Sequence, residues 1–366
     1  MTKFAPRTNL TRFSTTMFRL ICVFFAVSGA NAAGVTPLFS SQNVIDVTIS
    51  APFATIMQER NEENEYEGVL DYTDAAGLQH HLDLKLEIRG RFRARKDICN
   101  FAPLRLNFRK KQTVNTEFEG QNKLKLVTHC HNGGSHYEQF VLKEQLSYQF
   151  LAALTENAFR TRLLRMTYVD SEGRNKPRTK YAFLIETQKQ LADRIGGKRV
   201  KVPAIEFDQL DHTQVNLVTV FSYFLGNTDL SAIRGPGDDE CCHNVELFEQ
   251  TPGLFVPVPY DFDFSGMVDA PYAAPNPRFG IRRVTTRLYR GLCRNNALLE
   301  GTFKKFLDNK QEIYGLVENQ QGLNKKSLRE VTNYVDKFYY TIERDKLIER
   351  EFLKECSEAT APPAPT

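Results

Sequence analysis

Apolar and polar residues alternate through much of the N-terminal half of the chain. The alternation runs through residues 44–50, 82–88 and 104–108, and it returns at residues 124–127. A period of two is typical of half-buried β-strands. The sequence Asp-Ala-Ala-Gly at residues 74–77 is a turn signal and predicts a hairpin. We therefore expect mainly antiparallel sheet in this half.

Helical periodicity appears first at residues 137–154, where Phe140, Glu144, Ser147 and Leu151 recur at spacings of three and four. Beyond residue 186 the helical period dominates. The stretches expected to be helical there are residues 210–225, 299–316 and 327–352. In the last of these, Ser327 and Glu330 have the spacing of a capping box. This change of period predicts an α+β protein with a β-rich lobe over residues 33–187 and a helical lobe over residues 188–358.

The first 32 residues have the pattern of an export signal. A basic segment ends at Arg19, residues 20–27 are apolar, and Ala30-Asn31-Ala32 has the small residues of a cleavage site. The apolar run is shorter than the ~20 residues that a membrane-spanning helix needs. We expect a signal peptide over residues 1–32 and a periplasmic or secreted protein without stable membrane insertion. The Ala- and Pro-rich residues 359–366 are expected to form a disordered tail.

Composition narrows the possible partners. The chain has 366 residues, of which 41% are hydrophobic and 25% charged, which is ordinary globular usage. Its formal charge of +4 equals the contribution of Lys3, Arg7, Arg12 and Arg19, all inside the predicted signal. The remaining chain has no excess of positive charge, and we expect no nucleic-acid partner.

Six cysteines follow the predicted signal, an even number that suits disulfides in an oxidising compartment. Cys241 and Cys242 are adjacent, and we expect each to reach a distant partner because a vicinal bridge is strained. A metal site is the alternative for Cys130, which lies between His129 and His131.

Three segments bring together residues that suit metal-dependent chemistry. They are Gly-Asn-Thr-Asp at residues 226–229, His243-Asn244, and Pro-Tyr-Asp-Phe-Asp-Phe at residues 259–264. On an extended segment Asp261 and Asp263 would project to the same side. Two such carboxylates repel unless a cation lies between them, and oxygen ligands suit Mg²⁺ or Mn²⁺.

These segments, in this order, resemble the catalytic loop and metal-binding segment of the spore-coat protein H (CotH) kinase family. Upstream segments at residues 88–90, 103–108, 123–126 and 181–186 resemble that family in type and order. The resemblance implies a two-lobed atypical protein-kinase-like fold, with an antiparallel-sheet-rich N-lobe and a mainly helical C-lobe. It also implies transfer of the ATP γ-phosphoryl group to a hydroxyl of a protein or small molecule, with Mg²⁺ or Mn²⁺ as cofactor.

Carried over by motif, Asp229 matches the catalytic base, Asn244 and Asp261 match the metal ligands, and Asp263 supplements them. One departure is that fourteen residues separate Asp229 from Asn244, where conventional kinases have four. Asp239 precedes Asn244 with the conventional spacing and is a rival base.

The phosphates need a cradle, because no Walker A sequence and no GxGxxG occurs. Residues 89–95 contain four arginines and one glycine and can clamp an anion; a solvated hairpin tip is the alternative. The residues expected to contact the nucleotide are Arg89, Gly90, Arg105, Lys125, Glu144 and Glu186. The alternatives are that Arg105 and Lys125 face outward, that Glu144 is an exposed acid on its helix, and that Glu186 begins a turn.

A second cationic stretch, at residues 282–294, carries arginines at spacings of three and four. It could receive an acidic protein substrate or pair with Asp and Glu elsewhere.

Two other functions stay open. A catalytically silent kinase-like module could serve as an envelope or surface binding protein, which the missing Gly-rich loop favours. A metal-dependent hydrolase would need another base near Asp261 and Asp263. Labelled ATP with Mg²⁺ or Mn²⁺ separates the enzyme from the binding protein.

Overall fold

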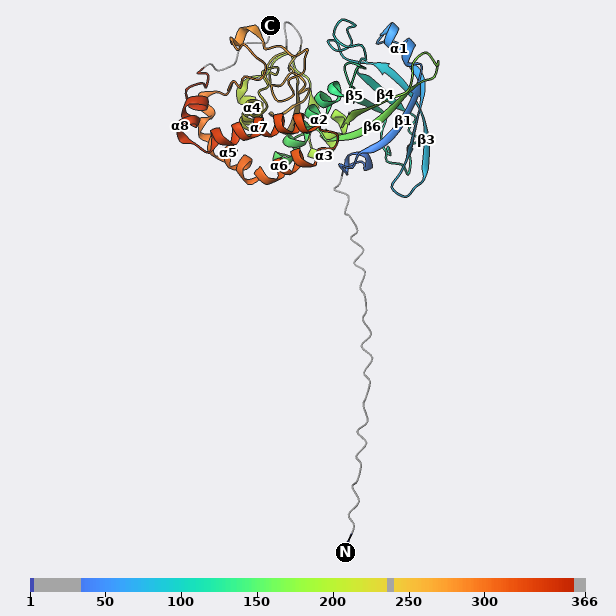
Figure 1. Cartoon of the computed structure of the whole chain (residues 1–366). Coiled ribbons are helices and arrows are strands. Elements are labelled where there is room, and N and C mark those ends of the chain that lie inside the picture. The colour runs from blue at the N-terminus through green and yellow to red at the C-terminus, as the bar shows by residue number, and fades with distance from the viewer. Residues whose placement is uncertain (3–33, 236–239, 359–366) are drawn as a thin grey trace. The chain divides into compact units, whose positions relative to one another are not determined.

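The strands of the N-terminal half close into a barrel in the computed structural model, which describes residues 1–2, 34–235 and 240–358 (Figure 1). The barrel strands are β1 (Ile45–Ala51), β2 (Tyr66–Thr73), β3 (Gln79–Ile88), β4 (Leu104–Phe108), β5 (Lys123–Val127), β6 (Thr161–Asp170) and β7 (Arg178–Ile185). Their order around the barrel is β1-β2-β3-β4-β5-β7-β6. Apart from its first two residues, the predicted signal lies outside the described residues, as does the predicted tail.

Closure depends on one parallel pairing. β1 runs beside β6 from the pair Ile45 and Leu164 to the pair Ala51 and Asp170. The other barrel pairs are antiparallel. Because the strands alternate, their inward side chains fill the barrel with a hydrophobic core that includes Leu84, Leu106 and Met166.

The expected two-lobed kinase-like fold is therefore wrong. The chain is α+β, but its N-terminal strands form a closed barrel, whereas a kinase N-lobe is an open sheet. The alternation of apolar residues predicted β1, β3, β4 and β5. It could not predict the pairing of β1 with β6, because that pairing joins segments more than a hundred residues apart.

Helices form most of the remaining structure. They are α1 (Phe53–Glu59), α2 (His136–Leu154), α3 (Gln188–Ile195), α4 (His212–Leu225), α5 (Leu299–Asp308), α6 (Lys310–Asn319), α7 (Lys325–Ile342) and α8 (Asp345–Ile348). A small antiparallel sheet has the order β10-β9-β8, with β8 (Lys198–Val200), β9 (Val245–Thr251) and β10 (Leu254–Pro259). The two long helices expected near the C-terminus are shorter pieces, and α7 is capped by Asn324, whose Oδ1 accepts from Ser327 N at 2.8 Å. The capping box expected at Ser327 is wrong.

A second hydrophobic core joins α2 to the C-terminal helices and to the outer face of the barrel. It includes Leu146 of α2, Phe183 of β7, Phe224 of α4 and Phe338 of α7. Figure 1 shows α2 between the barrel and these helices. The described residues from 34 onward form one compact unit, and the division into lobes at residue 187 stays a prediction.

The prediction of disulfides is confirmed. Cys99 is bonded to Cys130 and Cys293 to Cys356. Cys241 is bonded to Cys242, so the expectation of two distant partners for this pair is wrong. The bond to Cys99 also removes the metal alternative for Cys130. Disulfides are compatible with the predicted export. In the described part of the chain, no helix has the length and apolar character needed to cross a membrane.

Candidate functional site

The loop that carries Asp229 begins where α4 ends. Gly226 terminates the helix with φ of +64°, and a Cβ there would lie 2.1 Å from the hydroxyl of Tyr334, so the position requires glycine. Asn227 follows, and its Oδ1 accepts from Asp229 N at 2.9 Å. This bond fixes the backbone at Asp229 directly beyond the helix.

Asp229 is held by two residues of the next segment. Its Oδ1 lies 2.9 Å from Nε2 of His243, and Asn244 donates from Nδ2 to the backbone oxygen at 2.8 Å and to Oδ2 at 3.0 Å. The hydrogen bond to this carboxylate raises the pKa of His243. Asn244 has φ of +52°, a left-handed conformation that turns its side chain back toward Asp229.

The orientation of Asn244 leaves its amide oxygen available. Both hydrogen bonds to Asp229 come from Nδ2, and within the described ranges no donor contacts Oδ1. The fourteen intervening residues therefore do not separate Asp229 from Asn244 in space. The rival base Asp239 lies outside the described residues.

Asp261 and Asp263 differ in environment. β10 ends at Pro259, and Asp261 has φ of +61°, so the segment is not the extended strand on which both carboxylates would face one side. Asp261 is exposed, and its N–H donates to the hydroxyl of Tyr148 at 2.8 Å. Asp263 is 5% exposed. The expectation that the two project alike is wrong, because the chain turns between β10 and Asp263.

Asp263 belongs to a buried cluster of charges. Its Oδ2 accepts from the Tyr272 hydroxyl at 2.9 Å and lies 3.9 Å from Nη1 of Arg93. The same Arg93 nitrogen lies 3.7 Å from Oε2 of Glu144 on α2. Burial raises the pKa of Asp263 to about 7, and it raises the pKa of Glu144 well above its usual range.

The three aspartates are close enough to interact. The charges of Asp261 and Asp229 each raise the pKa of Asp263 further. Asp261 also contributes to the raised pKa of His243. The structure thus brings the predicted Asp229, Asn244, Asp261 and Asp263 into one neighbourhood, although no group of three His, Cys, Asp or Glu side chains in the described ranges is arranged to hold a metal.

Two of the predicted cations face this neighbourhood. Arg89 follows β3, and its buried Nε has no hydrogen-bond partner among the described residues. Burial lowers its pKa, and the charge of Asp261 opposes that shift. Lys125 of β5 lies 4.9 Å from the centre of the Tyr260 ring, and burial lowers its pKa to about 8. Gly90, beside Arg89, is exposed and has φ of +83°.

Of the other predicted nucleotide contacts, Arg105 and Glu186 are engaged elsewhere, whereas Glu144 belongs to the buried cluster of charges. Arg105 donates to Glu87 at 2.9 Å on the outer face of the barrel. Glu186 is 4% exposed and accepts from Arg194 at 3.0 and 2.8 Å. Glu144 lies beside Arg93. A buried carboxylate with two bonds from one guanidinium is a structural pair, so the geometry does not favour nucleotide contact by Glu186.

Sequence reasoning missed several residues at the site. Arg93 was counted only as one of four loop arginines, and Tyr148 and Tyr272 had no signal. The arginines at residues 282–294 were expected to meet a substrate or acidic side chains, but Arg290 donates from Nη1 to the backbone oxygens of Thr228 and Leu230, both at 3.0 Å. Only Arg294 of this stretch has a described acidic partner, Asp208.

Comparisons with known proteins add no assignment. No family model, no curated protein and no solved structure matches the chain.

Proposed function

We propose that this chain is a metal-dependent phosphotransferase that resembles the CotH kinases and transfers the ATP γ-phosphoryl group to a hydroxyl. The observation that carries the proposal is the geometry of Asn244. Its amide nitrogen is fixed on Asp229, so its oxygen is left free in the neighbourhood of the exposed Asp261. A base and two neutral or anionic oxygen ligands are what phosphoryl transfer needs.

The donor set fits a hard cation. The amide oxygen of Asn244 and the carboxylate of Asp261 are oxygen ligands of the kind that Mg²⁺ and Mn²⁺ prefer. Such an ion, when bound, neutralises charge on the phosphates. Oδ2 of Asp263 is already bonded to Tyr272, so only Oδ1 would be available to supplement these ligands.

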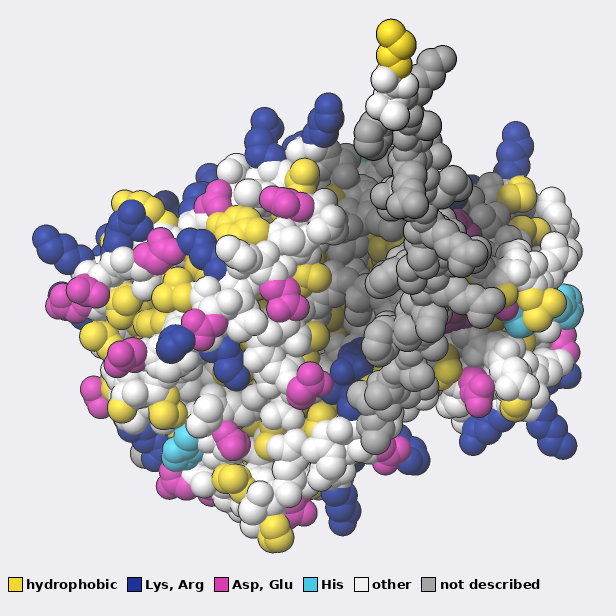
Figure 2. All heavy atoms as spheres, turned by 90° about the horizontal axis from the view of Figure 1, so that it is seen from below, with side chains coloured by type: hydrophobic (Ala, Val, Ile, Leu, Met, Phe, Trp, Pro, Cys, Tyr) yellow, Lys and Arg dark blue, Asp and Glu magenta, His cyan; other side chains and the backbone are white. Residues whose placement is uncertain are grey.

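The remaining residues have separate tasks in this proposal. The hydroxyl of the substrate donates a hydrogen bond to Asp229. Its oxygen forms the new bond to the γ-phosphorus of ATP while the bond between that phosphorus and ADP breaks. Asp229 takes the proton of the hydroxyl. Arg89 and Lys125 hold the phosphates. The acceptor is a protein or small molecule. Figure 2 shows acidic and basic side chains interspersed on the face that it draws. The expectation that the protein has no nucleic-acid partner stays a prediction.

The catalytically silent binding protein is the second candidate. Protein kinases depend on an ion pair between a helical Glu and the Lys that binds the phosphates. Here Glu144 of α2 lies against Arg93 instead of Lys125. This observation favours the binding protein.

The test is turnover by the disulfide-intact protein. Purified protein is incubated with γ-labelled ATP and Mg²⁺ or Mn²⁺, and phosphate transfer and ADP release are measured. We expect Asp229→Asn to lose at least about 100-fold in rate. Asp269→Asn, a change at an exposed aspartate of the segment that follows, should have wild-type activity. Binding of ATP without turnover would establish the silent module, and turnover unchanged in Asp229→Asn would contradict the assigned base.

A further inference from the structure

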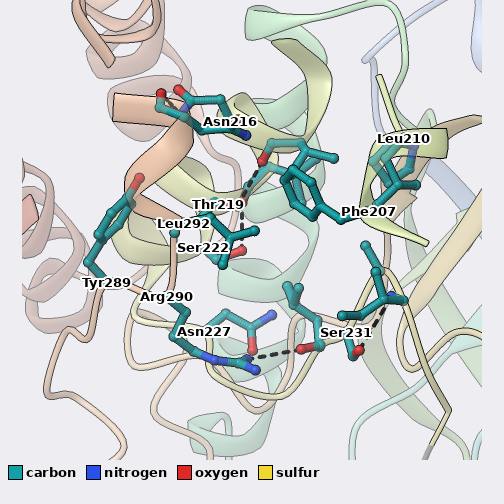
Figure 3. A pocket seen from close by; sticks show the side chains of 18 of the residues that line it. Phe207, Leu210, Asn216, Thr219, Ser222, Asn227, Ser231, Tyr289, Arg290 and Leu292 are labelled. Carbon is teal, nitrogen blue, oxygen red and sulfur yellow. Dashed lines mark hydrogen bonds between the residues drawn. The ribbon is translucent and has the colours of Figure 1, made fainter. Parts of the chain in front are cut away.

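A cavity lies directly behind the loop that carries Asp229. Its walls are α4, residues 227–233 and residues 288–292, and its volume is about 70 Å³ (Figure 3). Most of the lining is apolar, from Phe207, Leu210, Val218, Ile233, Leu288 and Leu292. Charged ligands are disfavoured in such a place, because desolvation of a charge costs more than apolar contacts return.

Two polar groups in the lining have no hydrogen-bond partner among the described residues, the amide nitrogen of Asn227 and the hydroxyl of Tyr289. Asn227 is 1% exposed, and its amide nitrogen makes no hydrogen bond to any described residue. Figure 3 shows this nitrogen turned toward the space between Ser222 and Ser231. A buried donor without an acceptor is costly and uncommon in folded proteins. An acceptor delivered by a ligand would satisfy it.

Apart from the Tyr289 hydroxyl, several polar groups of the lining are already engaged. Thr219 and Ser222 donate to carbonyls of their own helix, and Arg290 donates to Thr228 and Leu230. Asn216 donates to the carbonyl of Asn295. The cavity therefore offers a mainly apolar surface with two unmet polar groups, the Asn227 amide nitrogen and the Tyr289 hydroxyl. Figure 3 shows the Tyr289 hydroxyl turned away from Asn227, so the Asn227 donor is the one beside the loop that carries Asp229.

We propose that this cavity binds a small neutral molecule with a compact apolar body and one hydrogen-bond acceptor. The acceptor meets the amide nitrogen of Asn227. The oxygen of the same amide holds Asp229 N at 2.9 Å, so a ligand that fixes Asn227 also steadies the loop that carries Asp229. Binding does not require the phosphotransferase activity and can be tested without it.

The test uses two ligands of nearly the same shape. Cyclobutanone carries a carbonyl acceptor, and methylenecyclobutane replaces that oxygen by a methylene group. Calorimetric titration of the wild-type protein should show the ketone binding about fivefold more tightly, the ordinary value of one hydrogen bond. Hydrogen exchange at the Asp229 amide should slow on binding of the ketone. Equal affinities, or no binding of either ligand, would overturn the proposal.

Two variants of Thr219 provide the matched control. Thr219→Leu places extra apolar atoms in the cavity and should weaken binding of the ketone at least tenfold. Thr219→Val removes the hydroxyl but leaves the volume nearly unchanged, and should bind as the wild type does. Unweakened binding by a folded Thr219→Leu protein would show that the ligand lies elsewhere, and the comparison of the two ligands stands even if that variant does not fold.

Discussion

Arg290 fastens the loop that carries Asp229, and its removal gives a prediction whose size follows from the structure. The guanidinium lies over the ring of Phe279 at 4.5 Å and donates from one nitrogen to the backbone oxygens on either side of Asp229. Arg290→Met keeps most of the apolar stem and removes the two hydrogen bonds. Any effect of the change therefore reports on the contacts of the guanidinium, chiefly its two hydrogen bonds together with its contact with Phe279, and not on lost packing of the stem.

A hydrogen bond from a charged donor contributes about 1.5 to 3 kcal/mol. Because Arg290 is half-buried and water can reach part of the loop, the lower value applies to each bond. Two bonds give about 3 kcal/mol. With a urea m-value of about 3 kcal/mol per molar, the unfolding midpoint should fall by about 1 M.

The assay is equilibrium urea unfolding with disulfides intact, followed by circular dichroism. Arg294→Met is the matched control, because Arg294 makes an exposed pair with Asp208, and such pairs contribute little. Its midpoint should stay close to that of the wild type. Equal midpoints for Arg290→Met and Arg294→Met would refute the fastening role of Arg290.

Two further predictions concern stability. The pKa of Asp263 is about 7 in the folded protein against an ordinary 3.8, so the folded state binds a proton between these values that the unfolded chain releases. The free energy of unfolding should therefore fall as pH rises from about 4 to 7. The side chain of Asp263→Asn is neutral at every pH. The free energy of unfolding of this variant should exceed that of the wild type by up to about 4 kcal/mol above pH 7 and by almost nothing at pH 4. If urea titrations show the same difference at both pH values, the prediction is contradicted. The Cys99–Cys130 bond closes a loop with a sequence separation of 31, and replacing both cysteines by serine should cost about 3 to 4 kcal/mol in the same assay. Unchanged stability would show that the bond adds nothing to the contacts around it.

Much of the secondary structure could be predicted from the sequence, whereas the architecture could not. Alternation placed β1, β3 and β4, because one face of each strand is buried inside the barrel. The period of three and four placed α2 and α4. Closure of the barrel depends on the parallel pairing of β1 with β6, and no local pattern encodes which strand pairs with which.

The sequence allowed the candidate site to be proposed as a set of residues, but it did not predict how those residues are arranged. Asp229, Asn244 and Asp261 could be found because polar side chains at the ends of apolar segments form a recognisable order. Their contacts depend on left-handed backbone at Asn244 and Asp261, which residue type does not reveal. Arg290 could not be found, because its partners are backbone carbonyls sixty residues away and carry no sequence signal.

Tyr148 is one of the residues through which the barrel and the acidic segments meet, and it helps to explain how one neighbourhood holds both cations and carboxylates. Tyr148 of α2 packs against Phe183 of the barrel and Phe262 of the acidic segment, and its hydroxyl accepts from Asp261 N. On the barrel side, burial lowers the pKa of Lys125 to about 8. A phosphate placed beside this lysine would favour its charged form, so anion binding would take up a proton near pH 8. On the other side, the exposed Asp261 carboxylate remains for a cation. The fold thus places Lys125 and Asp261 on separate segments, whereas Arg93 and Asp263 pair with each other between those segments at 3.9 Å.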